Sequence, residues 1–218
     1  MTVDIAVQTL VDALADALRQ QVLTGKLSAG SRVTEQEVAS TYGVARPTAK
    51  AAIERVVQTG ILRRTANKTA KVPLLSEDDI EDLYRSRIFF ERNAVTALAR
   101  LAAVPAEAEH SLESMRRALD SESFVDMIAS DIGFHSALVS GLGSPRISRM
   151  YETIVGEAHL CMAQEQSRGE LGREENYEEH RAIIESIRAR DAKHAEKLAV
   201  DHLTSAASRV LGRSFRLY

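Results

Sequence analysis

The chain of 218 residues is 44% hydrophobic, so it is long enough to bury a core and slightly exceeds the usual size of one domain. Its single cysteine, Cys161, excludes an intramolecular disulfide and is typical of a reducing compartment. The net charge of −3 is unevenly distributed along the chain. Residues 1–75 carry ten Lys and Arg against six Asp and Glu, whereas the remaining residues carry eighteen against twenty-five. A basic module is therefore joined to an acidic one.

The N-terminal segment predicts a helix and no targeting signal. Apolar residues at helical spacing run from Val11 to Val22, and Gly25 follows as the stop. The segment is acidic and lacks the basic start of a secretory signal, and no apolar run in the chain approaches the roughly 20 residues of a membrane span. We therefore expect a cytoplasmic protein without membrane contact.

Residues 34–60 predict two short helices joined by a tight turn. Thr34 and Glu37 have the spacing of a capping box, and Gly43 can take the positive φ that a tight turn needs. Pro47 suits the first turn of the second helix, where a missing N–H is tolerated. The polar edge of that helix is formed by Arg46, Thr48, Lys50 and Arg55.

A basic hairpin is predicted to follow, with strands at residues 61–64 and 70–72 before Pro73 ends the unit. Between positions 46 and 71 seven basic residues face one acid, Glu54. The basic residues are Arg46, Lys50, Arg55, Arg63, Arg64, Lys68 and Lys71. Charge alone would equally suit a solvated helix face, but together with the turn, the caps and the wing it indicates a winged helix-turn-helix that binds DNA phosphates.

Residues 27–30, 34–44, 46–47 and 60–62 look like the DNA-binding domain of the GntR superfamily of bacterial transcription regulators. The resemblance implies that the helix beginning at Arg46 enters the major groove of a double-stranded operator while the wing reaches the minor groove. It also implies a homodimer on a pseudo-palindromic operator, as is usual for helix-turn-helix proteins. The residues that we expect to contact DNA are Arg46, Thr48, Lys50, Arg63, Asn67 and Lys68.

Three positions depart from the family pattern. Ala45 replaces the usual serine or threonine and removes a helix cap worth about 1 kcal/mol. Arg46 can pair bidentately with guanine, whereas Lys50, where the family usually has arginine, lacks the planar fork. Asn67 occupies the usual wing glycine, and asparagine tolerates a left-handed turn. We therefore expect DNA binding with an operator sequence that cannot be taken from relatives.

Residues 76–218 predict an all-α domain, because the helical signals continue without convincing strands. The expected helices form a compact antiparallel bundle and cover residues 77–102, 105–119, 123–142, 145–166, 176–190 and 191–211. The fold class is therefore mainly α, with a winged helix-turn-helix domain over residues 1–73 and a six-helix bundle over residues 76–218.

The third helix of this domain carries two polar residues on its apolar stripe. Asp131 and His135 are four residues apart and project from one helix face, while His180 and His202 lie on the apolar faces of the fifth and sixth helices. A buried carboxylate is costly unless it is paired or bound to a cation. A lone inward histidine is more often a hydrogen-bonded core residue than a ligand. One Asp and three His together favour a divalent transition metal, with zinc first and nickel or manganese as alternatives.

Segments 131–135 and 179–181, together with His202, look like the metal-ligand motifs of the FCD effector domain in the FadR-like branch of the GntR superfamily. The resemblance covers almost the whole chain and implies a metal that helps to hold a small organic acid as effector. Six helices rather than seven suggest the VanR-like subgroup.

The first helix of the domain carries Arg87 and Glu91, which match an Arg and a Glu found four residues apart in the family. The resemblance makes Arg87 the candidate for binding the effector's carboxylate, since its fork suits bidentate recognition. A salt bridge between Arg87 and Glu91 on the helix surface is an equal alternative. The acidic residues Glu178 and Glu179 are most simply explained as a solvated face.

These observations together predict a ligand-responsive transcription regulator, not an enzyme, in which an organic acid shifts the spacing of two winged domains. Two alternatives stay open. A metal-dependent hydrolase with a DNA-targeting module would need a general base near a metal-bound water, and neither Glu157 nor Glu178 is convincingly inward. A direct metal sensor would make the metal itself the signal.

Overall fold

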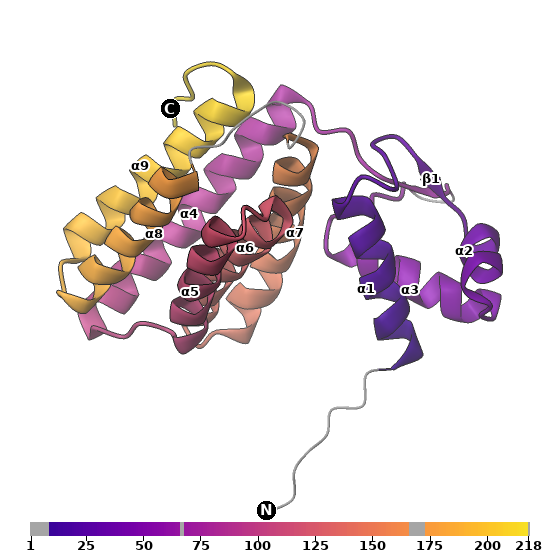
Figure 1. Cartoon of the computed structure of the whole chain (residues 1–218), viewed down its shortest axis with the longest axis horizontal. Coiled ribbons are helices and arrows are strands. Elements are labelled where there is room, and N and C mark those ends of the chain that lie inside the picture. The colour runs from indigo at the N-terminus through magenta and orange to yellow at the C-terminus, as the bar shows by residue number, and fades with distance from the viewer. Residues whose placement is uncertain (1–8, 66–67, 166–172, 218) are drawn as a thin grey trace, which may run out of the picture. The chain divides into compact units, whose positions relative to one another are not determined.

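The computed structural model describes residues 9–65, 68–165 and 173–217 (Figure 1). The chain divides into two compact units, Met1–Leu74 and Leu75–Tyr218. The described part of the first unit contains helices and a small sheet, and that of the second contains helices. The predicted fold class, a winged helix-turn-helix followed by an all-α domain, is confirmed.

Three helices form the frame of the first unit, α1 (Leu10–Leu23), α2 (Glu35–Tyr42) and α3 (Arg46–Gln58). Both α1 and α2 pack against α3. The core between them contains Leu14, Leu18, Val38, Ile53 and Val56. Because these residues follow the helical repeat, their burial also explains why the helices form where they do.

The turn between α2 and α3 has the predicted geometry. Thr34 caps α2 by accepting a hydrogen bond from the backbone N–H of Glu37, and its hydroxyl donates to the Glu37 carboxylate at 2.7 Å. Gly43 has a φ of 64°, in the left-handed region that favours glycine. Ala45 stands at the N-cap of α3 and makes no side-chain hydrogen bond there, so α3 begins without the usual cap.

The sheet of the first unit differs from the prediction. Strand β2 (Ala70–Lys71) pairs antiparallel with β1 (Arg32–Val33), a strand that the sequence did not predict. The predicted strand over residues 61–64 contributes an isolated bridge, in which the N–H of Arg63 donates to Lys71 at 2.9 Å and the N–H of Lys71 donates back at 3.0 Å. The prediction of that strand is therefore wrong in its extent.

The reason lies in the burial of the residues before the bridge. Ile61 and Leu62 are consecutive and both buried, whereas a strand with one face in solvent alternates between buried and exposed positions. Both side chains therefore pack into the core of the unit, and the segment does not continue as a β-strand. Asn67, at the predicted tip of the wing, lies outside the described residues.

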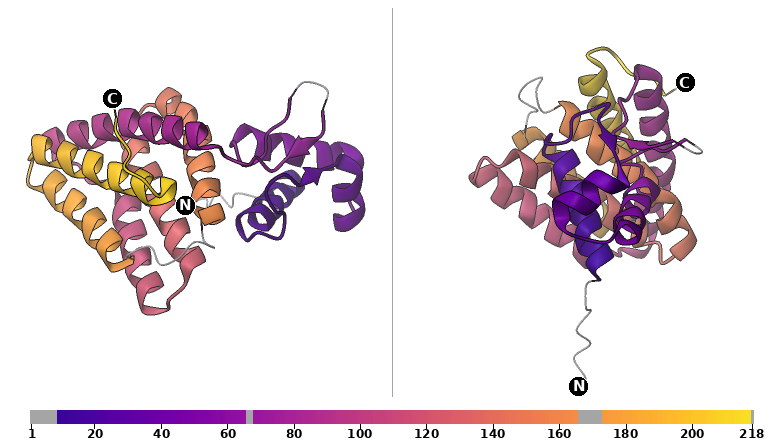
Figure 2. Two further views of the ribbon diagram at one scale, coloured as in Figure 1. Left: turned by 90° about the horizontal axis from the view of Figure 1, so that it is seen from above. Right: turned by 90° about the vertical axis from the view of Figure 1, so that its right-hand side faces the viewer.

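In its described part, the second unit consists of six helices, as predicted. Their bounds are α4 (Glu77–Leu101), α5 (Ala106–Asp120), α6 (Phe124–Ser140), α7 (Pro145–Glu165), α8 (Arg173–Arg188) and α9 (Ala192–Leu211). The 25-residue α4 packs against α6, α7, α8 and α9, and Figures 1 and 2 show α9 alongside it. None of the helices in the described part of the chain combines the length and apolar character needed to cross a membrane.

The segment after α9 folds back onto the start of α4. Ser76 caps α4, and the guanidinium of Arg213 donates to Glu77 at 3.0 Å and to Glu81 at 2.7 Å. Phe215 is buried in the cluster that also holds the apolar residues of the first turns of α4. The beginning and the end of the described bundle are therefore tied together.

Candidate metal centre

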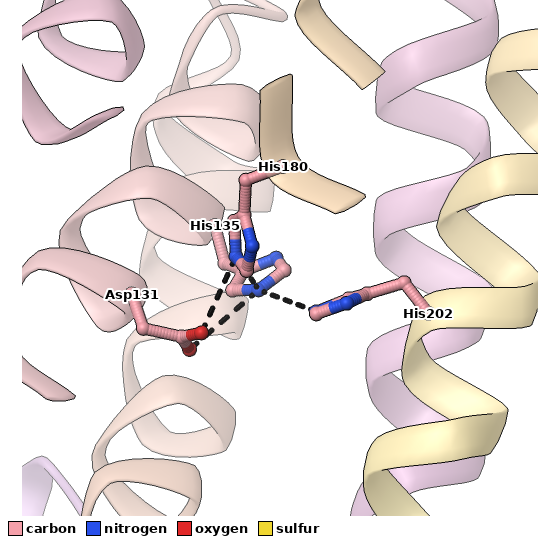
Figure 3. Close-up of side chains that lie close together, drawn as sticks. All are labelled: Asp131, His135, His180 and His202. Atoms are coloured by element: carbon pink, nitrogen blue, oxygen red, sulfur yellow. Dashed lines mark hydrogen bonds and ion pairs between the residues drawn. The ribbon is translucent and has the colours of Figure 1, made fainter. Parts of the chain in front are cut away.

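Four polar side chains meet inside the helical unit (Figure 3). Asp131 and His135 come from α6, His180 from α8 and His202 from α9, and each is at most 4% exposed. One ligand atom from each lies within 4.8 Å of the others. The structure thus brings together all four residues that the sequence proposed as metal ligands.

The ligand atoms face one another at short range. Nε2 of His135 lies 3.2 Å from Nε2 of His180 and 3.3 Å from Nε2 of His202. The Asp131 carboxylate lies 3.2 Å from Nε2 of His180 and 3.6 Å from Nε2 of His135. Two nitrogens that each lie about 2.0–2.1 Å from a tetrahedral zinc ion are about 3.3 Å apart. The spacing of the imidazoles therefore suits a shared divalent ion.

Two of the histidines have their other ring nitrogen close to a carboxylate. Nδ1 of His202 lies 2.6 Å from a Glu179 oxygen on α8, in hydrogen-bonding geometry. Nδ1 of His135 lies 2.5 Å from a Glu91 oxygen on α4, although its N–H is not aligned with that oxygen. An ionised carboxylate only accepts hydrogen bonds, so each neutral ring must carry its proton on Nδ1. The Nε2 atoms of these rings then keep their lone pairs.

Asn176 orients the other two members of the cluster. Nδ1 of His180 lies 2.6 Å from the backbone carbonyl of Asn176, which again requires the proton on Nδ1. The side-chain amide of Asn176 donates to Asp131 at 3.2 Å. Metal-binding histidines usually donate their second ring N–H in this way, and such partners fix the orientation of the ring.

Three imidazole lone pairs and one carboxylate consequently converge on one point. When the rings are neutral and their one proton is on Nδ1, these Nε2 atoms, 3.2 and 3.3 Å apart, cannot donate to one another and their lone pairs repel. A divalent cation removes this conflict, and three imidazole nitrogens with one carboxylate oxygen form a donor set suited to zinc, nickel or manganese. The residues present thus fit a transition metal.

Burial and neighbouring charges favour neutral histidines and an ionised aspartate, which are the protonation states that bind a metal. Burial lowers the pKa of His202 to about 4, with a further contribution from His180. Burial likewise lowers the pKa of His135, although Glu91 opposes the shift. Burial would raise the pKa of Asp131, but His135 and His180, when they are protonated, hold it well below its usual value, so the carboxylate is ionised. At neutral pH His135 and His202 are therefore neutral and Asp131 is ionised, as metal binding requires.

Arg87 and Glu91 form a buried ion pair beside the cluster. Nε of Arg87 donates to Glu91 Oε1 at 2.9 Å, and the Tyr151 hydroxyl donates to the same oxygen at 2.6 Å. Both charged residues are 1% exposed, so the alternative of a pair on the helix surface is wrong. Nη2 of Arg87 is buried and has no hydrogen-bond partner among the described residues. Nη2 of Arg87 therefore has hydrogen-bond donors that no described residue uses.

The sequence did not predict Glu91, Asn176 and Glu179 as partners of the histidines. The expectation that Glu179 lies on a solvated face is wrong, because the residue is only 26% exposed and accepts from His202. The position of Asn176 one helical turn before His180 is a signal that could have pointed to it. Glu91 meets His135 only after α4 and α6 have packed, so sequence spacing carries no such signal for that contact.

The residues proposed to contact DNA, apart from Asn67, which lies outside the described residues, are in the first unit and not buried. In the described part of the chain, the exposed members of the set are Arg46, Lys50, Arg63 and Lys68, and Thr48 is half-buried. A hollow of about 380 Å³ lies between the N-terminus of α2, Arg46 and Lys68. The set therefore shares one unit and is accessible to a large partner.

Two members of the predicted basic patch are neutralised by acids. Arg55 forms an ion pair with Asp12 of α1, and Arg64 lies 2.5 Å from Glu54 of α3. Arg55 and Arg64 therefore contribute less to the net positive charge of the patch. The first pair connects α1 to α3, and the second connects α3 to the segment that follows it.

Two family models together match most of the chain. The model of the FCD domain matches residues 82–205, and the model of the bacterial regulatory proteins of the gntR family matches residues 10–72. The first match includes all four residues of the cluster as well as Arg87. The second spans the three helices and both strands of the first unit.

Individual relatives resemble the chain over nearly its whole length. It is 27% identical to the uncharacterized HTH-type transcriptional regulator BphR of Paraburkholderia xenovorans, with 93% of this chain and 85% of the relative covered. It is 24% identical to the HTH-type transcriptional repressor NanR of Enterobacter sp., with 94% and 86% covered. A solved GntR transcriptional regulator from Rhodococcus sp. RHA1 has the same fold, with a TM-score of 0.80 at 22% identity, covering 93% of this chain and 97% of that one.

Proposed function

Because the chain belongs to the GntR family of bacterial DNA-binding transcription regulators and carries an FCD domain, we propose that its operator binding responds to a small carboxylate held at the buried metal centre. The observation that carries this proposal is the convergence of three imidazole Nε2 atoms and the Asp131 carboxylate beside Arg87. A structural core does not need an unpaired guanidinium edge next to a set of lone pairs, whereas an anion site does.

The four residues of the cluster would hold a divalent metal, with zinc the best fit to the spacing. When bound, the metal supplies a positive charge that attracts a carboxylate. Arg87 would bind the same anion through its Nη2 edge, and the ion pair with Glu91 keeps the guanidinium in place. The burial of these residues excludes competing water, so their charges act strongly on a small ligand.

DNA would be bound by the first unit, as the family implies. We propose that Arg46 reads a guanine in the major groove. Thr48 and Lys50 lie on the same helix, whereas Arg63, Asn67 and Lys68 belong to the wing. Two copies of the chain would read the two halves of a pseudo-palindromic operator. The effector acts only through a difference in its affinity for the two arrangements of the dimer, free and bound to DNA.

The proposal is tested with His135→Ala and His180→Ala variants and with His194→Ala as a matched control. His194 is an exposed histidine of α9 that lies outside the cluster. Elemental analysis should find stoichiometric metal in the parent protein and in the control, and none in the two cluster variants. A thermal-shift screen of small carboxylates should then stabilise only the proteins that hold metal. A parent protein that holds no metal, or cluster variants that still release operator DNA in response to an acid, would refute the proposal.

A direct metal sensor is the second candidate, and the burial of the cluster bears on it. Four ligands at most 4% exposed favour a slowly exchanging ion over one that is sampled from a cellular pool. A sensor predicts that operator affinity follows the free metal concentration set by a metal buffer. A resident cofactor predicts that the metal survives dialysis and that operator affinity changes only when an acid is added.

A further inference from the structure

Glu91 is in contact with three donors that come from three different helices. Arg87 of α4 donates through Nε to Oε1 at 2.9 Å, and Tyr151 of α7 donates through its hydroxyl to the same oxygen at 2.6 Å. The other oxygen, Oε2, lies 2.5 Å from Nδ1 of His135 on α6. Glu91 is 1% exposed, so it is shielded from bulk water. One carboxylate therefore joins α4, α6 and α7.

Only an ionised carboxylate can serve all three donors at once. Its two oxygens accept and neither donates, so one can face Arg87 and Tyr151 while the other faces His135. Because Nδ1 of His135 lies 2.5 Å from an oxygen that can only accept, a proton on Nδ1 is favoured there over a second lone pair, even though the N–H is not aligned with the oxygen. The lone pair of its Nε2 is then directed at Asp131 and the other histidines, where a metal ligand must present it.

We propose that Glu91 is a positioning residue that fixes the Nδ1–H tautomer of His135 and joins this metal ligand to Arg87 in one unit. The inference rests on the proposed function, since it gives the metal centre and the anion-binding arginine a common partner. An anion that draws Arg87 toward itself pulls on the same carboxylate that orients His135. Metal binding and anion binding are therefore coupled through Glu91.

The other two histidines are oriented without such a shared partner. His180 faces a backbone carbonyl, that of Asn176. His202 faces Glu179, which is 26% exposed and lies 3.9 Å from the guanidinium of Arg209. Glu179 thus supplies a matched control, because it accepts from a histidine of the same cluster and does not connect that histidine to Arg87.

The variant Glu91→Gln keeps the size of the side chain but changes its hydrogen bonding. It therefore distinguishes a positioning role of Glu91 from a role in packing alone. A glutamine has one carbonyl oxygen, and the two donors Arg87 and Tyr151 will hold it on their side. Its amide N–H then points at Nδ1 of His135, which must accept and so moves its proton to Nε2. In Glu179→Gln the oxygen can stay on His202, because no second donor lies within hydrogen-bond distance of it in the described structure.

The first readout is the tautomer of each histidine in the metal-free protein at pH 7.5, measured from the ¹⁵N chemical shifts of the ring nitrogens. We expect Nδ1–H at His135 in the parent protein and in Glu179→Gln, and Nε2–H in Glu91→Gln. The second readout is zinc affinity by competition with a chromophoric chelator. Glu91→Gln should lose about 10- to 100-fold, and Glu179→Gln should lose less.

Retention of Nδ1–H at His135 in Glu91→Gln, or equal losses of zinc affinity in the two variants, would overturn the inference. If Glu91→Gln does not fold, the parent spectrum alone decides, because an Nε2–H tautomer at His135 there also overturns it. Failure of the proposed function is distinguishable from both results. A parent protein that binds no zinc refutes the metal centre, while the tautomer of His135 still tests the role of Glu91.

Discussion

The two units of the chain place their charged residues in opposite positions. In the winged unit the proposed DNA contacts such as Arg46 and Lys50 are exposed, over a core made of apolar side chains. In the helical unit Arg87, Glu91 and Asp131 are inside the core, where Glu91 contacts His135 and Asp131 faces His135 and His180. Function in the first unit is therefore separable from stability, whereas in the second the same residues determine both.

Among the tests of this comparison, the substitution Arg87→Met should have the largest effect. The substitution leaves the Glu91 charge buried without its guanidinium partner, so the helical unit should lose about 3–5 kcal/mol of unfolding free energy. Urea unfolding of the metal-free protein, followed by circular dichroism, measures the loss. Arg46→Ala is the matched control in the winged unit and should change stability by less than about 0.5 kcal/mol. A loss below 1 kcal/mol in Arg87→Met would remove the contrast between the units.

Acid should destabilise the helical unit selectively, because all six histidines of the chain follow position 109. The unfolded chain binds a proton at His202 below a pKa of about 6.5, whereas burial lowers the pKa of the folded protein to about 4. The unfolded state therefore holds more protons between these values, and stability falls as the pH is lowered through this window. At pH 4 the loss should reach on the order of 3 kcal/mol, with His135 acting in the same direction.

Melting temperatures of the metal-free protein between pH 7.5 and 4 measure this effect. The variant His202→Gln removes the titrating group and should flatten the dependence. A melting temperature that stays constant from pH 6.5 to 4 in the parent protein would contradict a buried neutral imidazole at this position.

Arg46→Ala should weaken operator binding by about 5- to 150-fold, because a bidentate contact with a base contributes about 1–3 kcal/mol. Fluorescence anisotropy on a duplex selected from random sequences measures the change. Lys68→Ala should weaken binding of all sequences alike and reduce the salt dependence, as expected of a phosphate contact. Equal effects of both variants on matched and mismatched duplexes would argue against base reading by Arg46.

The smallest effect is expected from Arg55→Ala. Its guanidinium already pairs with Asp12, and both side chains are partly exposed, so the loss of stability should be below about 1 kcal/mol. Operator affinity should change less than in Lys50→Ala, which removes an exposed charge of the same helix. A larger loss of affinity in Arg55→Ala would show that Asp12 releases the arginine when DNA binds.

Helices and cluster were predictable from sequence because both follow one periodicity. His180 and His202 lie where an apolar residue would continue the buried stripe, and that position alone directs them into the core. The strand β1 has two residues, too few for an alternating pattern, and its partner β2 lies 37 positions further along the chain. Ile61 and Leu62 have strand-like composition but are used by the core, which propensity cannot distinguish.

The outer partners of the cluster escaped prediction for a different reason. Glu91 and His135 are on separate helices, and no repeat in either helix indicates which acid will meet which imidazole. Arg87 and Glu91 show the same limit, because their spacing predicts an ion pair but not its burial. Local spacing thus identifies candidate ligands, while packing decides which groups hold those ligands in orientation.

The continuity of α4 has a mechanical consequence. From Glu77, two residues after Leu75, the helix runs unbroken to Arg87 and Glu91, a rise of about 15 Å to Arg87 at 1.5 Å per residue. Arg213 donates hydrogen bonds to Glu77 and Glu81 in the first two turns of the same helix. A displacement of Arg87, the proposed anion-binding residue, would therefore be transmitted along a rigid helix to its N-terminus at Glu77, because no loop lies between these two residues.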